Sequence, residues 1–318
     1  MNPIKQPYFH TFQSSLSPFQ IYQALGPMQD RIFLDSSKED SPYSCYSYIG
    51  VEPFLILRCE KGSNLIKDLR KEPAAWEDLG SSDFYKLLKD TLAQFPTRNE
   101  TTFPFVGGAL GYFSYDLPDA YLVFYDLILA YDHRNKQYSF CSMEIFPDAR
   151  ERIHSYVEKI NTYAQEQWLF PPKKRISSKP VIMKSPFSEE EYMQQVEVMK
   201  EYIAAGHIYI ANMTHTFSGE VVDDPFTYYG NLREINPAPF SAYLPLEDFS
   251  LLCSSPERFL KLSKGKVETR PIKGTRPRSN DPFLNEQMKE ELLASEKDKS
   301  ELLMIVDLER NDLSRVCK

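Results

Sequence analysis

The sequence predicts an α+β protein in which large, twisted antiparallel sheets are flanked by helices. Two observations carry this prediction. Residues 1 to about 147 hold short runs of β-branched and aromatic residues that are separated by turn residues. Helix signals are instead confined to a few places, namely residues 148–169, residues 188–206 and the stretch after residue 295. A chain of 318 residues with 42% apolar residues is long enough for about two domains and can fill a sizeable core.

The strand candidates of the first half follow one another closely. They are residues 31–35, 45–49, 54–58 and 122–131. Residues 105–116 place three glycines within five positions beside aromatic residues, which suits a close backbone approach inside a packed sheet. This stretch lacks the strand-then-helix setting of a phosphate-binding loop, so nucleotide binding is not favoured there.

The middle of the chain predicts a helix followed by a linker. Asp148 can cap a helix that runs to about Leu169. Residues 171–180 are rich in proline and charge and have almost nothing to bury. We therefore predict an N-terminal region at 1–170, a linker at 171–184 and a second region at 185–318. The basic cluster of the linker suits a solvated connector better than a nucleic-acid site.

The second region starts with a well-marked helix. Ser188 and Glu191 form a capping box, and Gly206 ends the helix. Residues 207–217 are β-branched and aromatic enough to predict a strand, with Ile210 and Asn212 on one face. That face could line a small-molecule site, or it could belong to a central strand whose polar atoms are satisfied. The pattern leaves both readings open.

Composition excludes several classes of partner. The 37 basic and 45 acidic residues give a net charge of -8, which argues against nucleic acid and anionic membranes as general partners. The five cysteines are scattered without metal-binding spacing, which fits a reducing cytoplasm. We see neither a signal peptide nor an apolar run of about 18 residues, so a cytoplasmic protein without a membrane span is predicted.

Glu257 is the first residue near the end of the chain that could carry chemistry. It follows a turn-forming group and precedes the apolar residues Phe259 and Leu260. A carboxyl group beside a buried strand keeps its proton more readily than one in water, which suits a general acid. Extended backbone would point Glu257 and Arg258 to opposite faces. A surface glutamate at the start of a strand is the alternative.

Lys273 lies beside the flexible Gly274 in a strongly basic segment. Three arginines surround it, namely Arg270, Arg276 and Arg278. Such a loop could hold an anionic substrate, and the neighbouring cations would favour a neutral, nucleophilic amine. An exposed basic loop without a ligand is the alternative.

Glu301 lies on the last predicted helix, which Ser295 and Asp298 would start. On that helix Glu301 aligns with the apolar residues Met304 and Ile305. An ionised carboxylate on an apolar stripe is costly unless a cation compensates it. Magnesium, which commonly takes one or two carboxylates, is suitable. A salt bridge to a nearby arginine is the competing explanation.

Together these segments resemble the chorismate-utilising enzymes, a family that includes anthranilate synthase component I, aminodeoxychorismate synthase component I, and the isochorismate and salicylate synthases. The resemblance covers nearly the whole chain. Its motifs occur in the family order at residues 105–112, 206–209, 236–240, 254–259, 271–276 and 307–313. The resemblance implies an anthranilate synthase component I-like fold.

The resemblance also implies a reaction. Anthranilate synthases typically carry alanine where this chain has Lys273, whereas aminodeoxychorismate synthases carry lysine. The implied activity is conversion of chorismate and ammonia to 4-amino-4-deoxychorismate, for 4-aminobenzoate and folate synthesis. Lys273 would be the nucleophile, Glu257 the acid and Glu301 a ligand of Mg²⁺. A glutamine amidotransferase subunit would deliver the ammonia. Further substrate-binding candidates are Gly274, Thr275 and Asn212.

The resemblance places a tryptophan site in the N-terminal region of some family members. Ser36 and Tyr46 lie in roughly the corresponding segments and are the candidate ligands here.

The sequence departs from the family at two places. Ile210 replaces an expected glutamine, and the histidine, glycine-rich loop and second magnesium carboxylate that follow in the family are not found. Residues 185–318 are therefore expected to be only the N-terminal part of a chorismate-binding domain. A non-catalytic homologue that binds a partner subunit is the alternative function. Anthranilate synthase is disfavoured by Lys273.

Overall fold

The computed structural model describes residues 6–101, 103–115, 119–169, 181–221 and 223–318. The chain forms two compact units, the first made of Met1–Pro172 and Tyr229–Lys318 and the second of Lys173–Tyr228. Most of the predicted linker at 171–184 lies outside the described residues. The predicted boundaries of the two regions stay predictions.

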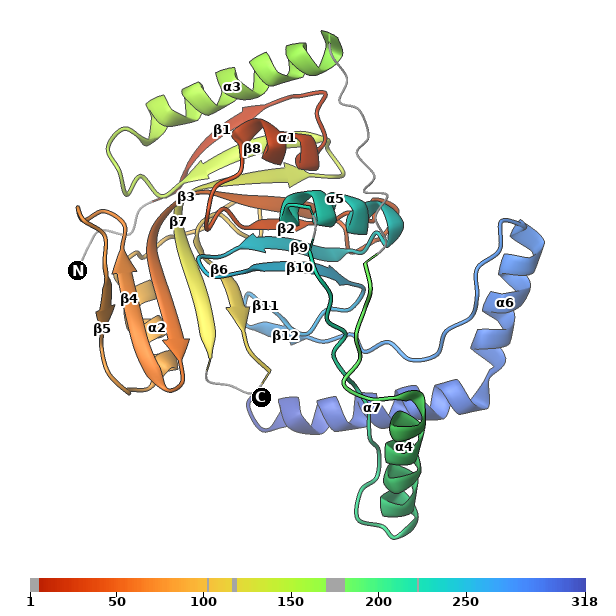
Figure 1. Ribbon diagram of the computed structural model, residues 1–318. Helices are drawn as coiled ribbons and strands as arrows, with labels where there is room; N and C mark the ends of the chain where they lie inside the picture. Colours follow the sequence, from red (N-terminus) through yellow and green to blue (C-terminus); the bar gives the residue numbers. More distant parts are fainter. Residues whose placement is uncertain (1–5, 102, 116–118, 170–180, 222) are drawn as a thin grey trace. The chain divides into compact units, whose positions relative to one another are not determined.

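One antiparallel sheet dominates the first unit (Figure 1). Its main path runs in the order β1-β8-β7-β3-β2-β9-β10, while β4 pairs with β3 and β5, and β6 pairs with β7. The strands are β1 (Tyr8–Phe12), β2 (Phe33–Asp35), β3 (Tyr46–Glu60), β4 (Ser63–Asp68), β5 (Trp76–Asp78), β6 (Gly108–Phe113), β7 (Ala120–Asp132), β8 (Gln137–Ser142), β9 (Phe240–Pro245) and β10 (Ser250–Ser255). With its flanking helices this sheet confirms the predicted α+β class.

Both faces of the central strand β7 are buried. Val123 and Tyr125 belong to one apolar cluster, and Leu122 and Phe124 belong to another. Successive side chains of a strand point to opposite faces, so the two clusters lie on the two sides of the sheet. This double burial explains why residues 122–131 are an almost continuous apolar run.

Strand β3 differs from its prediction. Residues 45–49 and 54–58 were expected as two strands, but they form one strand whose register against β7 shifts between Gly50 and Leu55. Pro53 has no backbone N–H to donate, so the ladder is interrupted there and the strand bulges instead of ending.

The glycine-rich stretch forms strand β6, as its composition predicted. A Cβ atom on Gly111 would lie only 1.9 Å from the carbonyl oxygen of Tyr121. Glycine at this position therefore allows β6 to approach β7 closely.

Helices pack on the face of the sheet that lies opposite the cluster of Val123 and Tyr125. They are α1 (Pro18–Leu25), α2 (Phe84–Leu92), α3 (Ala149–Leu169) and α5 (Pro225–Ile235), the last of which joins the first unit from Tyr229 onward. A capping box between Ser17 and Gln20 starts α1, which packs on α3. Helix α3 confirms the helix predicted after Asp148. Among the described helices, none combines the length and apolar character needed to span a bilayer.

The chain returns to the sheet after the second unit. Strand β9 pairs with β2, and β10 pairs with β9. After β10 come a separate hairpin of β11 (Lys261–Ser263) and β12 (Lys266–Glu268), then α6 (Pro282–Ala294) and α7 (Glu296–Ser314). Neither α6 nor α7 has a buried residue.

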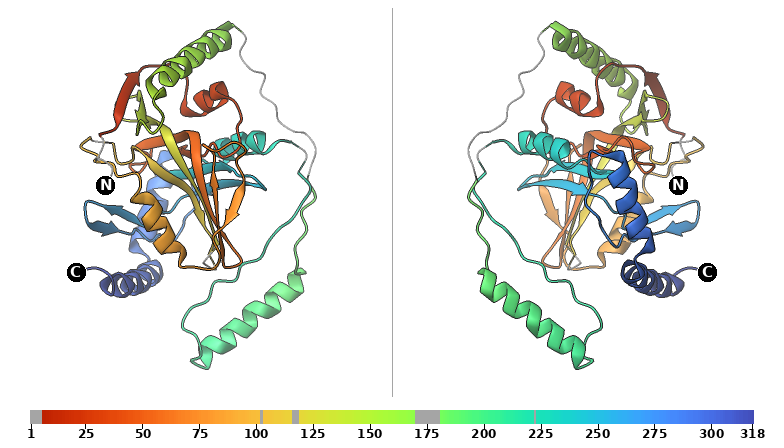
Figure 2. Two further views of the ribbon diagram at one scale, coloured as in Figure 1. Left: turned by 90° about the vertical axis from the view of Figure 1, so that its left-hand side faces the viewer. Right: turned by 90° about the vertical axis from the view of Figure 1, so that its right-hand side faces the viewer.

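The second unit contains α4 (Glu189–Ala204) between two extended segments, which Figure 2 shows as the two arms of an open loop. The capping box of Ser188 and Glu191 is confirmed. The strand predicted at 207–217 is wrong, because the only ladder contact described there is an isolated bridge between Lys184 and Ser218. A strand needs a neighbour to pair its backbone groups, and no described strand lies beside these residues.

Candidate functional site

The segments of Glu257 and Lys273 lie against each other. Glu257 follows β10, and its Oε1 accepts a hydrogen bond from the backbone N–H of Ile272 at 2.8 Å. Ile272 directly precedes Lys273. The acid candidate therefore holds the segment that carries the amine candidate.

Lys273 faces Glu301 on α7. Its Nζ lies 3.9 Å from Oε1 of Glu301, and the two side chains are 34% and 39% exposed. The cation beside Glu301 is therefore a lysine, not one of the arginines that were the competing explanation. Ser295 caps α7 by accepting from the N–H of Asp298, as predicted. The structure thus brings all three charged candidates into one chain of contacts.

Gly274 and Thr275 continue the same segment. Gly274 has a φ of +77°, and a Cβ there would lie 2.8 Å from Cδ1 of Leu292 and 3.0 Å from Cβ of Asp298. Glycine is therefore required both by the backbone conformation and by the close packing on the helices. The Thr275 side chain is exposed, and its carbonyl accepts from Arg276 at 2.9 Å.

The surroundings of Glu257 differ from the prediction. Its side chain is exposed, and Phe259 and Leu260 beside it are 85% and 47% exposed. The expected buried strand is not formed, because among the described strands β11 pairs with β12 alone, in a separate hairpin. The expected divergence of Glu257 and Arg258 rested on an extended backbone and stays a prediction; Arg258 pairs with Glu268.

The remaining predicted site residue, Asn212, lies in the second unit. Its side chain is exposed in the irregular stretch that was predicted to be a strand.

Glu301 fits a magnesium site only as a single carboxylate ligand. Among the described residues, no three His, Cys, Asp or Glu side chains gather as they would around a metal ion. Magnesium commonly keeps several waters and binds through one or two carboxylates together with substrate oxygens. A site of that kind needs no more from the protein than Glu301 can give.

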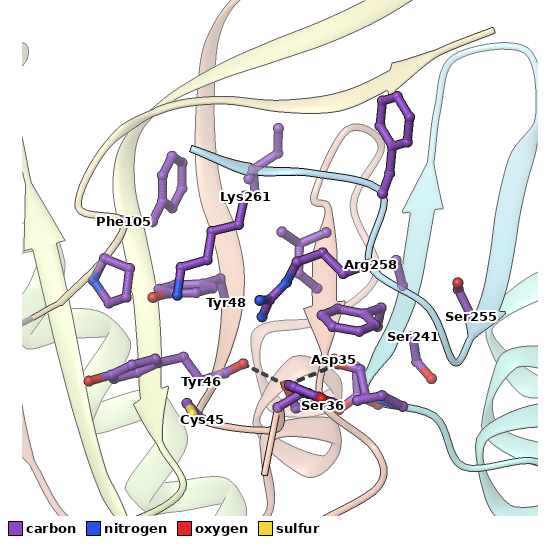
Figure 3. A pocket seen from close by; sticks show the side chains of 18 of the residues that line it. Asp35, Ser36, Cys45, Tyr46, Tyr48, Phe105, Ser241, Ser255, Arg258 and Lys261 are labelled. Carbon is purple, nitrogen blue, oxygen red and sulfur yellow. Dashed lines mark hydrogen bonds between the residues drawn. The ribbon is translucent and has the colours of Figure 1, made fainter. Parts of the chain in front are cut away.

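A cavity of about 670 Å³ lies next to these segments (Figure 3). Both tryptophan-site candidates line it, and the Ser36 hydroxyl donates to the carbonyl of Tyr46 at 2.7 Å. Glu257 lines the cavity as well. Glu257, the acid candidate, therefore lines this cavity and also contacts the segment that carries Lys273.

Aromatic walls and cationic side chains define the chemistry of the cavity. Tyr46, Tyr48 and Phe105 form one wall, and Arg258 and Lys261 project into the space (Figure 3). Burial raises the pKa of Tyr48, so its phenol stays neutral at physiological pH. Such a space suits a flat ring that carries a carboxylate.

Buried polar contacts fix the floor of the cavity. Asp35 accepts from Nε of Arg233 at 2.8 Å and from the Tyr229 hydroxyl at 3.1 Å. The Ser36 N–H donates to Ser47 Oγ, which also contacts Nε2 of His133 at 2.8 Å.

The contacts of Asp35 and Ser36 were not predicted from the sequence. Asp35 and Arg233 lie 198 positions apart, so no local pattern connects them. Burial lowers the pKa of His133, which keeps the ring neutral beside Ser47.

A model of chorismate-binding enzymes matches residues 29–318. Anthranilate synthase component 1 of Geobacillus stearothermophilus is 32% identical over 95% of this chain and 65% of its own length. Aminodeoxychorismate synthase component 1 is 33% identical in Bacillus subtilis, over 86% of this chain and 61% of that protein. The Escherichia coli protein of the same name is 31% identical, over 90% of this chain and 63% of its own length.

Two solved structures share the fold. Anthranilate synthase component I of Streptococcus pneumoniae superimposes with a TM-score of 0.64 at 22% identity, covering 94% of this chain and 67% of that one. The menaquinone-specific isochorismate synthase of Escherichia coli gives a TM-score of 0.52 at 12% identity, covering 95% of this chain and 63% of that one.

The chain thus spans less than two thirds of the length of the curated relatives named above. The family model nevertheless covers nine tenths of the chain, including every predicted site residue. On that match, this chain belongs to the family of chorismate-binding enzymes.

Proposed function

We propose that this chain carries the chemistry of aminodeoxychorismate synthase component I, which converts chorismate and ammonia to 4-amino-4-deoxychorismate. Overall similarity does not choose between this activity and anthranilate synthesis, because relatives of both names are about equally similar. Lys273 carries the proposal: it precedes Gly274 and Thr275, and its amine lies 3.9 Å from Glu301. An alanine at this position would supply no nucleophile.

The proposed reaction proceeds in two displacements. The Lys273 nitrogen bonds to C2 of the chorismate ring, the ring double bond shifts, and the C4 hydroxyl departs. Glu257 gives its proton to that hydroxyl, which leaves as water. Ammonia then bonds to C4, the double bond shifts back, and the C2 bond to Lys273 breaks. The proton lost by the added ammonia restores Glu257, so the net exchange is hydroxyl for amine with release of one water.

The contacts of the three residues support these roles. Glu257 is tied to the N–H of Ile272, so acid and amine move with one segment. The side chain of Lys273 is about one third exposed, so its nitrogen is accessible to a substrate. We propose Gly274, Thr275 and Asn212 as further substrate contacts, Gly274 because a residue without a side chain lets the backbone approach the ring.

We propose magnesium as the metal of this site, with Glu301 as its carboxylate ligand. When bound, the ion would neutralise the ring carboxylate of chorismate. We also propose that a glutamine amidotransferase subunit supplies the ammonia, as the names of the component 1 relatives suggest a further component.

We propose the cavity beside Ser36 and Tyr46 as a tryptophan site. Its aromatic wall can hold an indole ring, and Arg258 and Lys261 can hold the carboxylate. Calorimetric titration with tryptophan should detect binding, and Tyr48→Ala should weaken it at least tenfold. Equal binding by the two proteins would refute this assignment.

The test of the main proposal is incubation of the purified 318-residue protein with chorismate, ammonium and magnesium. Chromatography should detect 4-amino-4-deoxychorismate. Lys273→Ala should lower its formation at least about 100-fold, the scale of loss for a group that acts in the transition state. Lys299→Ala is the matched control, because Lys299 lies on α7 but pairs only with Glu296 among the described residues.

Other outcomes of the same assay separate the alternatives. Formation of anthranilate would replace the proposed reaction with that of anthranilate synthase. A folded protein that consumes no chorismate would favour the non-catalytic homologue that binds a partner, a reading supported by Ile210 and by the exposure of Glu257.

A further inference from the structure

Lys273 lies in an irregular segment between β12 and α6, and side-chain contacts hold this segment in place. One contact is the hydrogen bond from Ile272 to Glu257. Further contacts close to Lys273 come from Arg276, three residues along the chain.

Arg276 connects the segment to two helices. Its Nε donates to Oε1 of Glu291 on α6 at 2.9 Å, and its Nη2 donates to Oδ2 of Asp298 on α7 at 3.0 Å. Its Nη1 donates to the carbonyl of Thr275 at 2.9 Å. All three guanidinium nitrogens are therefore in use, which a lysine could not reproduce.

The spacing of these contacts links Arg276 to Lys273. Asp298 and Glu301 are three residues apart on α7, so they lie one turn apart on the same side of the helix. Arg276 pairs with the first and Lys273 with the second. Gly274 lies between them and packs against Asp298. The two ion pairs are successive cross-links between one segment and one helix.

The charges of Arg276 and Asp298 stabilise the contacts of Arg276. Hydrogen bonds from the Ser295 hydroxyl and then from Arg276 hold the pKa of Asp298 below its usual range. Hydrogen bonds to Glu291 and Asp298 raise the pKa of Arg276. Both partners of the Arg276–Asp298 pair are thus charged at neutral pH.

We propose that Arg276 is a positioning residue that ties the Lys273 segment to α6 and α7 and so holds the Lys273 amine beside Glu301. Its value for catalysis rests on the proposed function, whereas the placement of Lys273 is a property of the folded chain alone. Arg278 belongs to the same segment and has no ion-pair partner among the described residues, so Arg278→Gln is a matched control with the same loss of charge.

The placement is tested by acetylating the folded protein with an N-hydroxysuccinimide ester and following each lysine by mass spectrometry. Arg276→Gln should raise the acetylation rate of Lys273 at least threefold, because the amine is released from its neighbour. Arg278→Gln should leave the rate unchanged, and Lys264 serves as the internal reference in every sample. An unchanged Lys273 rate in Arg276→Gln, or an equal rise in Arg278→Gln, would overturn the proposal.

Asp298→Asn approaches the same contact from the helix and covers the case in which Arg276→Gln does not fold. Asp298→Asn should also accelerate Lys273 acetylation. In the double variant with Arg276→Gln, the fold-increase in the acetylation rate should be smaller than the product of the two single fold-increases. Fully multiplicative effects would mean that the two residues act separately, against the proposal.

Steady-state kinetics then tests the catalytic consequence. Arg276→Gln should lower kcat 10- to 100-fold with little change in KM for chorismate, since the amine is misplaced after the substrate binds. An unchanged kcat together with faster acetylation would refute the catalytic role. If the unmodified protein consumes no chorismate, the proposed function fails, and the acetylation result still decides the placement.

Discussion

The first compact unit contains two regions that differ in how deeply their side chains are buried. In the sheet region, which we define as residues 6–169 together with β9 and β10, several charged groups are buried and paired. Asp126 has a side chain with 0% exposure that accepts from Ser142 and pairs with Arg152. In the C-terminal segment, residues 256–318, neither helix has a buried residue.

The same contrast holds for one ion pair at each candidate site. Asp35 and Arg233 are 2.8 Å apart with side chains 1% and 20% exposed, whereas Lys273 and Glu301 are 3.9 Å apart and 34% and 39% exposed. A buried pair fixes structure, and an exposed pair can rearrange around a ligand. We infer that the sheet region supplies stability and the C-terminal segment supplies chemistry.

Apolar truncation should give the largest difference between the regions. Phe124→Ala removes a side chain that is 1% exposed, and the cavity it leaves should lower the free energy of unfolding by about 4 kcal/mol. Phe283→Ala removes the same atoms from a side chain that is 76% exposed and should cost less than about 0.5 kcal/mol. Urea unfolding followed by circular dichroism measures both. Similar losses would remove the distinction between the regions.

Ion-pair removal should give the next largest difference. Asp35→Asn leaves the Arg233 guanidinium without its charged partner and should cost about 2–3 kcal/mol. Glu301→Gln should change the free energy of unfolding by less than about 0.5 kcal/mol, because the pair is solvated. The same unfolding experiment applies, and a loss at Glu301 as large as that at Asp35 would contradict the account.

The pH dependence of stability should come from the sheet region. Burial raises the pKa of Asp30 above its ordinary value of 3.8, and the hydrogen bond from Tyr121 only partly opposes this. The folded state then binds more protons than the unfolded state above pH 3.8, so stability falls as pH rises through the folded-state pKa.

Asp30→Asn should remove this fall, because the amide does not titrate in this range. Unfolding midpoints measured from pH 4 upward in ~0.5-unit steps test it. Parallel pH profiles for Asp30→Asn and the unmodified protein would rule out Asp30 as the source.

Helix caps should give the smallest difference. Ser17→Ala removes the capping box of α1, whose buried face packs into the sheet region, and should cost about 1 kcal/mol of global stability. Ser295→Ala removes the cap of the exposed helix α7 and should speed hydrogen exchange in its first turn without lowering global stability. A drop in the thermal midpoint for Ser295→Ala equal to that for Ser17→Ala would show that α7 unfolds with the sheet.

The sheet could be predicted from sequence because its signals are local. Apolar runs such as 122–131, the glycines of β6 and the capping box at Ser188 each depend on neighbouring residues alone. The strand at 207–217 failed for a related reason: propensity favours a strand, but a strand also requires a partner, which no local pattern reports.

The candidate site was only partly predictable. The motifs pointed to Glu257, Lys273 and Glu301, which the structure brings into one chain of contacts, while their roles stay predictions. They could not place Asp298 beside Arg276 or Arg233 beside Asp35, because these contacts join residues far apart in the chain. They also suggested an apolar setting for Glu257, whereas its side chain and those of Phe259 and Leu260 are exposed.

Hydrogen exchange with and without chorismate and magnesium tests most directly whether the sheet region supplies stability while the C-terminal segment supplies the chemistry. We expect strong protection in the sheet region under both conditions, and ligand-induced slowing in peptides that contain Glu257, Lys273 and Glu301. Exchange in those three peptides that does not respond to chorismate, while the sheet remains protected, would contradict the claim that the C-terminal segment carries the chemistry.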